Sequence, residues 1–526
     1  MRKRPGFCYD EIRSILLIRL TMFAVGIDSG TQGTKVLVVD IRTGKVQGRG
    51  FAPHVMIPGL KPGENEQDPA TWIEALETAL SVALRAAGID AARIVSAGVS
   101  GQQHGFVPLD RDGTVIRPAK LWNDTATIEE TREIIDKLGG RDAVIEKLGL
   151  DLAVGYTASK ILWFKKHEPD RFKRLATVQL PHNYLNYHLT GKLHMEHGDA
   201  SGTGLMDVRR REWQAEAIEA VDPGLAEKLP ALCHPSEPVG TIQESFAAKF
   251  GLKKVLVSSG GGDNMMAAIG TGIVAPGVCM LSLGTSGTCS CFSEKPVVDP
   301  AGEIAAFCDG TGGWLPLLCT LNMTGATEAI KSLFRLDNAT LELLASEAPA
   351  GSQGLVFLPF LDGERVPALP QASGVFFGLN RGNFAAAPMA RAVMEGTILN
   401  IGYGFARMKE LGLDTIEIRA TGGGSKNRLW MQIAADILQK PVVTPREREA
   451  AAYGAALQSI WTFLRAKGED PGITELCSKM VKIERPSVDP DPGHFDVYEA
   501  LQERFQSLWT TLKPEFLKHR NLPDRS

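Results

Sequence analysis

Two turns with the same residues occur in separate halves of this chain, and both are rich in groups that can hold phosphate. The first stands in FAVGIDSGTQGTKVLVV and the second in MLSLGTSGTCSCF, with matching residues Gly30, Thr31, Gly33, Thr34 and Gly284, Thr285, Gly287, Thr288. Glycines let a backbone approach a ligand and expose successive N–H groups, while threonine hydroxyls add further donors. Two such turns facing each other across a cleft would hold a polyphosphate from both sides.

A Walker-type phosphate loop is a different motif that does not fit these turns. That loop needs G-x-x-x-x-G-K-[ST] leading into a helix. Here Lys35 is followed by Val-Leu-Val-Val, which is a strand pattern. One glycine turn alone would be an ordinary hairpin, so it is the duplication that favours ligand binding.

Two aspartates beside the glycine-rich segments are candidates for the chemistry. Asp28 lies in an apolar strand just before the first turn, and a buried carboxylate needs a cation or several donors. Magnesium at nucleotide sites is a suitable cation, and capping of its own turn is the alternative. Asp263 follows Gly260–Gly262 and opens a helix, whose N-terminus favours the ionised form that a general base requires. An N-cap without catalytic function is the alternative for Asp263.

The elements predicted around these residues alternate between strand and helix. Residues 23–46 predict an antiparallel ribbon, and residues 69–87 predict a helix with Asp68 as N-cap and Gly88 as its end. The segment IVSAGVSGQQHGFVPLD then predicts a strand, a polar turn and another strand. In such α/β arrangements, ligands bind at the loops beyond the carboxyl ends of the strands.

Three glycines between a strand and a helix also occur twice, at Gly260–Gly262 and Gly422–Gly424. The order of turn, triple glycine, turn and triple glycine is what two copies of one unit produce. The first copy spans 230 residues from Gly30 to Gly260 and the second 138 from Gly284 to Gly422, a difference of 92. We expect the extra material to form a specific substrate pocket.

Length and charge restrict the class of protein. A chain of 526 residues exceeds what one core usually serves, so two or more domains are expected. The 57 basic and 61 acidic residues give a net charge of -4 without a long basic run, which disfavours nucleic acid and membrane surfaces as partners. No uninterrupted apolar run reaches the length of about 18 residues that a membrane span needs. Small molecules are the expected partners.

The cysteines and the first residues favour a cytoplasmic protein. Eight cysteines show neither a C-x-x-C pair nor zinc-like spacing, which predicts reduced and mostly buried thiols. Charged residues interrupt any signal-peptide core near the N-terminus. We expect residues 1–21 to be a disordered and dispensable extension.

The motifs together resemble those of the FGGY carbohydrate kinases, within the actin and hexokinase superfamily. That resemblance implies an α/β fold of two duplicated ribonuclease H-like domains with a cleft between them. The motifs occur in the family's order as GIDSGTQGTK, SGQQHG, LWND, GGGDN, LSLGTSGT, FLPFLDGERVP, GVFFGL and GGGSKN. The implied division is a sugar-binding domain at 22–268 and an ATP-binding domain at 269–526.

Within the family the motifs are most similar to those of the xylulokinases, which implies ATP-dependent phosphorylation of D-xylulose at its 5-hydroxyl in pentose catabolism. The resemblance implies that Asp263 is the general base and that Asp28 holds the magnesium side of the site. The phosphate contacts that it implies are Thr31, Thr34, Lys35, Gly284 and Thr285. The adenosine contacts are Gly423, Gly424 and Asn427. The sugar contacts are Gln103, His104, Trp122, Asp124, Asp263 and Asn264.

Alternatives stay open at this point. Gln103 stands where many bacterial xylulokinases have methionine, so a kinase for ribulose, gluconate or glycerol remains possible. A filament-forming or chaperone-like ATPase and a non-catalytic sugar sensor are further classes. The alternative explanation for His104 and Trp122 is packing in the core. For Glu364 and Arg365 in GERVP the alternative is a structural ion pair. The resemblance also implies a homodimer.

Overall fold

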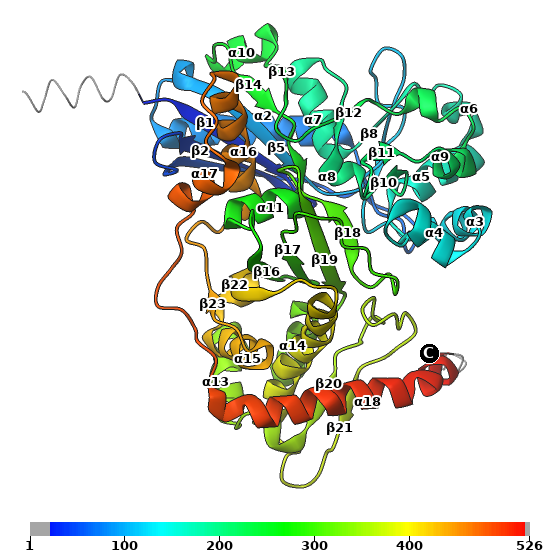
Figure 1. Ribbon diagram of the computed structural model, residues 1–526, viewed down its shortest axis with the longest axis vertical. Helices are drawn as coiled ribbons and strands as arrows, with labels where there is room; N and C mark the ends of the chain where they lie inside the picture. The colour runs from blue at the N-terminus through cyan, green and yellow to red at the C-terminus, as the bar shows by residue number, and fades with distance from the viewer. Residues whose placement is uncertain (1–20, 521–526) are drawn as a thin grey trace, which may run out of the picture.

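The computed structural model describes residues 21–520, which form two units stacked along the long axis of the molecule (Figure 1). The N-terminal extension expected at 1–21 lies outside the described residues except for Thr21. No helix within 21–520 is both long and apolar enough to cross a membrane.

The first unit is built on one mixed sheet. Its strands are β1 (Phe23–Ser29), β2 (Gly33–Asp40), β3 (Val46–Pro53), β5 (Ile94–Gly101), β13 (Pro238–Thr241), β14 (Leu256–Ser258) and β15 (Gly261–Gly262). They lie in the order β13-β14-β5-β1-β2-β3, with β15 beside β5. Because β1 pairs antiparallel with β2 and β2 with β3, the predicted ribbon is confirmed.

The second unit repeats this topology. Its strands are β16 (Gly277–Leu283), β17 (Gly287–Cys291), β18 (Ala305–Cys308), β19 (Trp314–Thr320), β22 (Thr415–Thr421) and β23 (Val442–Val443). They lie in the order β18-β19-β17-β16-β22-β23. As in the first sheet, the leading strand β16 pairs antiparallel with β17 and parallel with β22, and β22 is parallel to β23. The duplication predicted from the repeated turns is confirmed.

Alternate residues of β1 enter two different cores, which fixes the layers. Val25 and Ile27 pack in the core that contains α2 (Pro69–Ala87). Ala24 lies in the core on the other side, with α16 (Ala450–Ala466). Side chains alternate across a strand, so a strand such as β1, which is apolar from Phe23 to Ile27, is buried on both faces. Helices therefore cover both faces of the first sheet.

Helix α2 begins and ends where the sequence predicts. The Asp68 side chain accepts from the N–H of Ala70, Pro69 is the first helical residue, and Gly88 ends the helix at φ 61°. The left-handed conformation at a helix end is one that glycine adopts without a Cβ penalty.

The two units meet where α11 (Asp263–Thr271) crosses α16. A Cβ on Gly454 would lie 1.7 Å from the Met266 carbonyl oxygen, and one on Gly270 would lie 1.9 Å from the Ala450 carbonyl oxygen. The helices therefore touch through their backbones, and α16 packs against strands of the first unit (Figure 1). The expected boundary between residues 268 and 269 falls inside α11. We therefore propose that the boundary lies after Thr271, where this helix ends.

The longer first half inserts a set of small elements between β5 and β13. They are β6 (Val107–Leu109), β7 (Ala119–Lys120), α3 (Ile128–Leu138), α4 (Arg141–Leu148), α5 (Thr157–His167), α6 (Pro169–Phe172), β8 (Thr177–Gln179), α7 (Pro181–Thr190), β9 (Met195–Glu196), α8 (His197–Ala200), β10 (Met206–Asp207), β11 (Glu212–Trp213), α9 (Ala215–Val221) and β12 (Leu232–Cys233). Figure 1 shows α3, α4, α5 and α9 at one side of the first unit.

Other elements complete the described chain. In the first unit these are β4 (Glu66–Gln67) and α10 (Glu244–Phe250). In the second they are α12 (Thr324–Phe334), α13 (Asn338–Ser346), β20 (Val356–Leu358), β21 (Val375–Phe377), α14 (Ala386–Glu410), α15 (Arg428–Leu438) and α18 (Phe495–Arg520). Helix α17 (Ile473–Met480) packs on α16 and lies beside the first unit (Figure 1). Helix α14 packs on the second sheet as α2 packs on the first.

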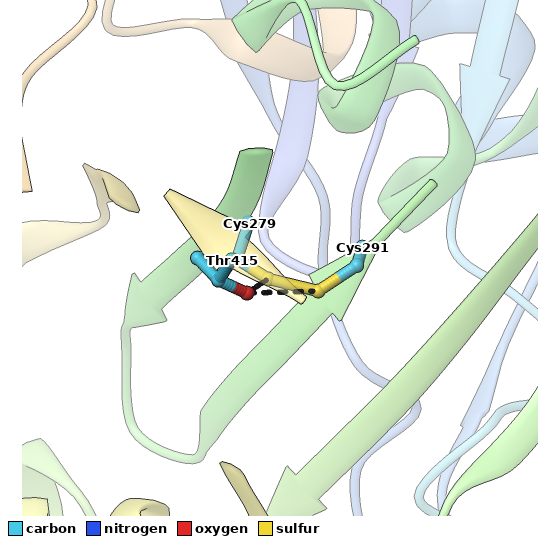
Figure 2. The surroundings of a disulfide bond; sticks show 3 residues. All are labelled: Cys279, Cys291 and Thr415. Carbon is cyan, nitrogen blue, oxygen red and sulfur yellow. Dashed lines mark hydrogen bonds between the residues drawn. A yellow bond between two sulfur atoms is a disulfide. The ribbon is translucent and has the colours of Figure 1, made fainter. Parts of the chain in front are cut away.

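Two cysteines of the second sheet form a disulfide, which corrects the expectation of reduced thiols. Cys279 of β16 and Cys291 of β17 face each other in register and are joined by an S–S bond of 2.00 Å (Figure 2). The Thr415 hydroxyl of β22 lies 2.8 Å from the Cys279 sulfur. Sequence spacing did not reveal this pair, because the two residues become neighbours only through the pairing of the strands.

Candidate active site

The ends of three adjacent strands bring the first glycine turn and the triple glycine together. Ser29 at the end of β1 pairs with Gly101 of β5, and Gly262 of β15 pairs with the same Gly101 from the other side. The turn after β1, the SGQQHG turn after β5 and the start of α11 therefore lie side by side. This is the edge where ligands bind in open α/β sheets.

Asp263 lies at the start of α11 but does not cap it. The N-cap is Gly262, and Asp263 is the first helical residue, so the N-cap alternative is wrong. A Cβ on Gly262 would lie 2.5 Å from the Gln103 side chain, so a glycine is required for this close approach. Burial, followed by the charges of Asp28 and Asp199, raises the pKa of Asp263 to about 7.

This raised pKa corrects the expectation that the helix terminus alone keeps Asp263 ionised. The backbone N–H of Asn264 donates to Asp263 Oδ1 at 2.9 Å and lowers the pKa, but burial and the like charges have the larger effect. A carboxylate with a pKa near neutrality is a stronger base than an ordinary aspartate and is suited to general base catalysis.

Asp28 lies across the ribbon from Lys35 and beside β5. Its Oδ1 accepts a hydrogen bond from Ser100 at 2.8 Å, and burial raises its pKa despite that bond and the charge of Lys35. Among residues 21–520 no group of three or more His, Cys, Asp or Glu could hold a metal ion. A single carboxylate is nonetheless what magnesium uses when substrate phosphates complete its shell, so Asp28 fits that role.

Lys35 and Thr34 already have protein partners. Lys35 Nζ lies 2.6 Å from Glu449 Oε2, with the two side chains 40% and 35% exposed. Burial alone would lower the pKa of Lys35, but the hydrogen bond and charge of Glu449 raise it. Thr34 is buried, and its hydroxyl lies 2.9 Å from His54 Nε2. His54 in turn bonds the Gly30 carbonyl through Nδ1 at 3.0 Å, so these residues brace the first turn.

Thr31 connects the first turn to the LWND segment. Its hydroxyl donates to Gln102 Oε1 at 3.2 Å and accepts from Trp122 Nε1 at 3.0 Å. Gln67 donates to the Thr31 carbonyl at 2.7 Å. Trp122 is 43% exposed, so core packing is wrong as its explanation and its indole face is open to a ligand.

His104 is held in an unusual backbone conformation by buried groups. Its φ is 58°, and its carbonyl accepts from Thr157 Oγ1 at 3.0 Å and Lys160 Nζ at 2.7 Å. Its Nδ1 lies 3.2 Å from Asp199 Oδ1, and burial lowers its pKa, so the ring is neutral at physiological pH. Burial also lowers the pKa of Lys160 to about 7. A strained residue held by several contacts is typical of binding sites.

The other sugar-contact candidates divide into two groups. Asn264 donates to Gln103 Oε1 at 2.6 Å, so these two amides lie together beside Asp263. Asp124 is fully buried, and its carboxylate accepts from Lys120 Nζ and the N–H of Asn65, both at 2.9 Å. These contacts fix the loop that carries Trp122 and leave Asp124 without access to a ligand, so its place as a direct sugar contact is the weakest of the set.

The second glycine turn and second triple glycine also lie together. A Cβ on Gly424 would come within 2.8 Å of Leu283, the last residue of β16, which is followed by Gly284. Thr285 and Gly423 are exposed, and a Cβ on Gly423 would meet no atom within 4 Å. Asn427 caps α15 by accepting from the N–H of Trp430 at 2.8 Å. Its side-chain oxygen is thus used within the protein.

Sequence reasoning missed a buried cluster below Gln103 and His104. His182 is fully buried, with Nδ1 3.2 Å from Asp199 Oδ2 and Nε2 3.6 Å from Glu196 Oε1. Burial raises the pKa of Glu196 to about 8. Burial alone would raise the pKa of Asp199, but the His104 and His182 rings, each 3.2 Å away, bring it below its usual value. No local motif marks these residues, because they come from separate parts of the inserted segment.

Glu364 does not pair with Arg365, so the ion pair considered for GERVP is not formed. The buried Glu364 carboxylate accepts from the N–H of Leu321 at 2.7 Å and from Asn400 Nδ2 at 3.0 Å. The charge of Arg365 instead reaches His104 and lowers its pKa in addition to the effect of burial. Arg365 is therefore a cation of the second unit whose charge acts on the His104 ring.

The duplicated fold, with a glycine turn in each unit and a carboxylate of raised pKa at one strand edge, is typical of phosphotransferases that use ATP. The model of the N-terminal domain of the FGGY family of carbohydrate kinases matches residues 23–270, and that of the C-terminal domain matches 279–463. The chain belongs to the FGGY family of carbohydrate kinases.

Individual relatives agree with that assignment. The chain is 42% identical over 489 residues to a xylulose kinase of Haemophilus influenzae, covering 91% of this chain and 98% of the relative. A crystal structure described as a xyloylose kinase from Brucella ovis superposes with a TM-score of 0.87 at 30% identity, covering 93% of this chain and 99% of that one. A gluconate kinase from Lactobacillus acidophilus has the same TM-score of 0.87 at 24% identity, covers 95% and 100%, and shares the fold.

Proposed function

We propose that this carbohydrate kinase transfers the γ-phosphoryl group of ATP to the 5-hydroxyl of D-xylulose in pentose catabolism, giving D-xylulose 5-phosphate and ADP. The relatives named xylulose kinase, such as the one from Haemophilus influenzae, support this sugar. The observation that carries the proposal is the position of Asp263 beside Gln103 and Asn264, on the strand edge that also bears the first glycine turn.

In the proposed reaction Asp263 accepts the proton of the 5-hydroxyl as the oxygen bonds to the γ-phosphorus. The bond from the γ-phosphorus to its bridging oxygen breaks, and ADP leaves with the electron pair. Asp263 then releases the proton to solvent. Phosphoryl transfer depends mainly on position and charge, so the protein must align these atoms more than activate them.

The sugar is held by the Gln103 and Asn264 amides, the neutral His104 ring and the open face of Trp122. These groups offer donors, acceptors and an apolar surface, which suits a polyol. Asp124 is kept in the proposal as a residue that positions Trp122.

The triphosphate lies between the two glycine turns, with Thr31 and Lys35 on one side and Gly284 with Thr285 on the other. The buried Thr34 supports the first turn through its contact with His54. Gly423 borders the adenosine because it leaves an open backbone next to the second turn, and the buried Gly424 lets that backbone approach Leu283 closely. Asn427 borders the adenosine from the start of α15. Asp28 would hold magnesium, which would neutralise phosphate charge when bound.

We also infer a cytoplasmic location and a homodimer, which rest on the family resemblance. A disulfide is uncommon in cytosolic proteins, so the Cys279–Cys291 bond is a point against that location. Light scattering on the purified chain would test the dimer.

The test of the proposed function is ADP release with a panel of sugars. D-Xylulose should give the highest kcat/KM, above D-ribulose, gluconate and glycerol, and the product should carry phosphate on its fifth carbon by NMR. A higher kcat/KM with another polyol would reassign the substrate. Sugar binding without ADP release would instead favour a sensor, and filament formation without sugar-stimulated turnover would favour an ATPase of another class.

A further inference from the structure

A cavity of about 400 Å³ opens at the junction of the two units, away from the glycine turns. One side of it is the turn between β2 and β3, and the other is formed by the segment before α16 and the end of α17. Its volume lies in the range of small-molecule sites, which runs from about 300 to 1,000 Å³. The polar and charged residues that border it include Thr43, Lys45, Arg49, Arg446, Glu447 and Lys482.

The cavity has a local excess of positive charge, although the whole chain has a net charge of -4. Glu447, its one acidic lining residue, is already occupied, because Arg49 donates to both of its oxygens at 2.7 and 2.6 Å. Lys45 and Arg446 are exposed and form no ion pair with any residue of the described chain. Among residues 21–520, Lys482 Nζ donates only to the backbone carbonyl of Lys479, at 2.5 Å. Three cations are therefore left without a carboxylate.

The floor of the cavity is rigid and largely apolar. Gly270 lines it at the crossing of α11 and α16, where a Cβ would lie 1.9 Å from the Ala450 carbonyl oxygen. The Tyr453 hydroxyl lies 2.9 Å from the Gly44 carbonyl oxygen and 3.0 Å from that of Met480, so its one proton is shared between the two carbonyls. That side chain thus ties the β2–β3 turn to the end of α17, and its ring lines the cavity with Met480. These contacts connect the two walls of the cavity.

We propose that this cavity binds a small organic phosphate between Lys45 of the first unit and Arg446 and Lys482 of the second. Phosphate groups pair with lysine and arginine through charge-assisted hydrogen bonds. A cavity of this volume with an apolar floor accommodates a carbon skeleton as well, which favours a phosphate ester over inorganic phosphate. The bound ester would lie against the helix crossing that joins the two units.

The proposal is independent of the sugar that the enzyme phosphorylates, and it is tested by calorimetric titration with 3-phosphoglycerate. Saturating ADP is present so that the glycine turns are filled. The proteins compared are the wild type, the double variant Lys45→Gln/Arg446→Gln, and the control Arg42→Gln. Arg42 is an exposed cation on the same turn that does not line the cavity, so the control removes one charge without changing the site.

Wild type and control should bind 3-phosphoglycerate alike, and the double variant should bind at least about tenfold more weakly. Inorganic phosphate should bind the wild type more weakly than the ester. The proposal is overturned by absence of binding to the wild type, by equal binding to the double variant, or by equal affinity for inorganic phosphate. Both substituted side chains are exposed, so thermal unfolding curves should show that all variants are folded.

Discussion

The indole N–H of Trp122 donates a hydrogen bond to the hydroxyl of Thr31, with the two atoms 3.0 Å apart. Trp122 belongs to the segment proposed to contact the sugar, and Thr31 belongs to the turn proposed to contact the phosphates. The two subsites are therefore in direct contact before any ligand binds. A substitution in one subsite should therefore change ligand binding in the other.

Trp122→Phe should raise the KM for both D-xylulose and ATP. The substitution keeps an aromatic face but removes the donor to Thr31. The loss of one such hydrogen bond corresponds to an increase in KM of about two- to tenfold. Steady-state kinetics with each substrate varied in turn measure this. If only the KM for sugar rises, the bond does not couple the two subsites.

The activity should fall as the pH drops through the pKa of Asp263, about 7, because the base must be ionised. Asp199 contributes to that raised pKa through its negative charge, after burial and Asp28. Asp199→Asn should therefore move the acidic limb of the kcat profile toward lower pH. Asp170→Asn, which changes an exposed carboxylate paired with Lys173, should leave the limb in place. If the acidic limb of the kcat profile stays in place in Asp199→Asn, the charge of Asp199 does not affect the pKa of Asp263.

Asp263→Asn should stabilise the fold above neutral pH. The folded-state pKa of Asp263 is raised from 3.8 to about 7, so the folded protein binds this proton more tightly than the unfolded chain does. The stability that the proton contributes is present below the unfolded pKa and is lost as the pH rises through about 7. At about pH 8 the unfolding temperature of the variant should exceed that of the wild type by about 1–3 °C.

That difference should shrink as the pH falls below neutrality, because the wild-type carboxyl then becomes protonated and neutral like the amide. Thermal unfolding followed by calorimetry at several pH values measures it. An equal or larger difference at acid pH would mean that the pKa of Asp263 is not raised in the folded protein.

Glu449→Gln should lower the KM for ATP by up to about fivefold, because it frees Lys35 to pair with phosphate and a half-exposed ion pair is weak. Kinetics with ATP varied measure this. Glu447→Gln is the matched control, since Glu447 pairs with Arg49 rather than Lys35. An unchanged KM in Glu449→Gln would mean that Lys35 does not exchange Glu449 for the nucleotide.

The parts of the fold that the sequence predicts are those governed by neighbouring residues. Helix α2 has its cap, its first-turn proline and its terminal glycine within one short stretch, and the repeated turns mark the duplicated sheets. The position of Asp263 beside the first turn also follows, because parallel strands end at one edge.

The parts that could not be predicted depend on distant contacts. The partners of His104 come from α5 and α8, and Glu449 reaches Lys35 from the other half of the chain. The raised pKa of Asp263 is a property of its burial and of two carboxylates that the sequence places far from it. The pairing of Cys279 with Cys291 likewise depends on strand register.

The most direct test of the account is the rate of D-xylulose-dependent ADP release by Asp263→Asn at saturating substrates. The amide preserves the shape of the side chain but cannot accept the proton of the acceptor hydroxyl. We predict that kcat falls by about 100- to 10,000-fold while the fold remains intact. A kcat within about threefold of the wild-type value would contradict the assignment of Asp263 as the base.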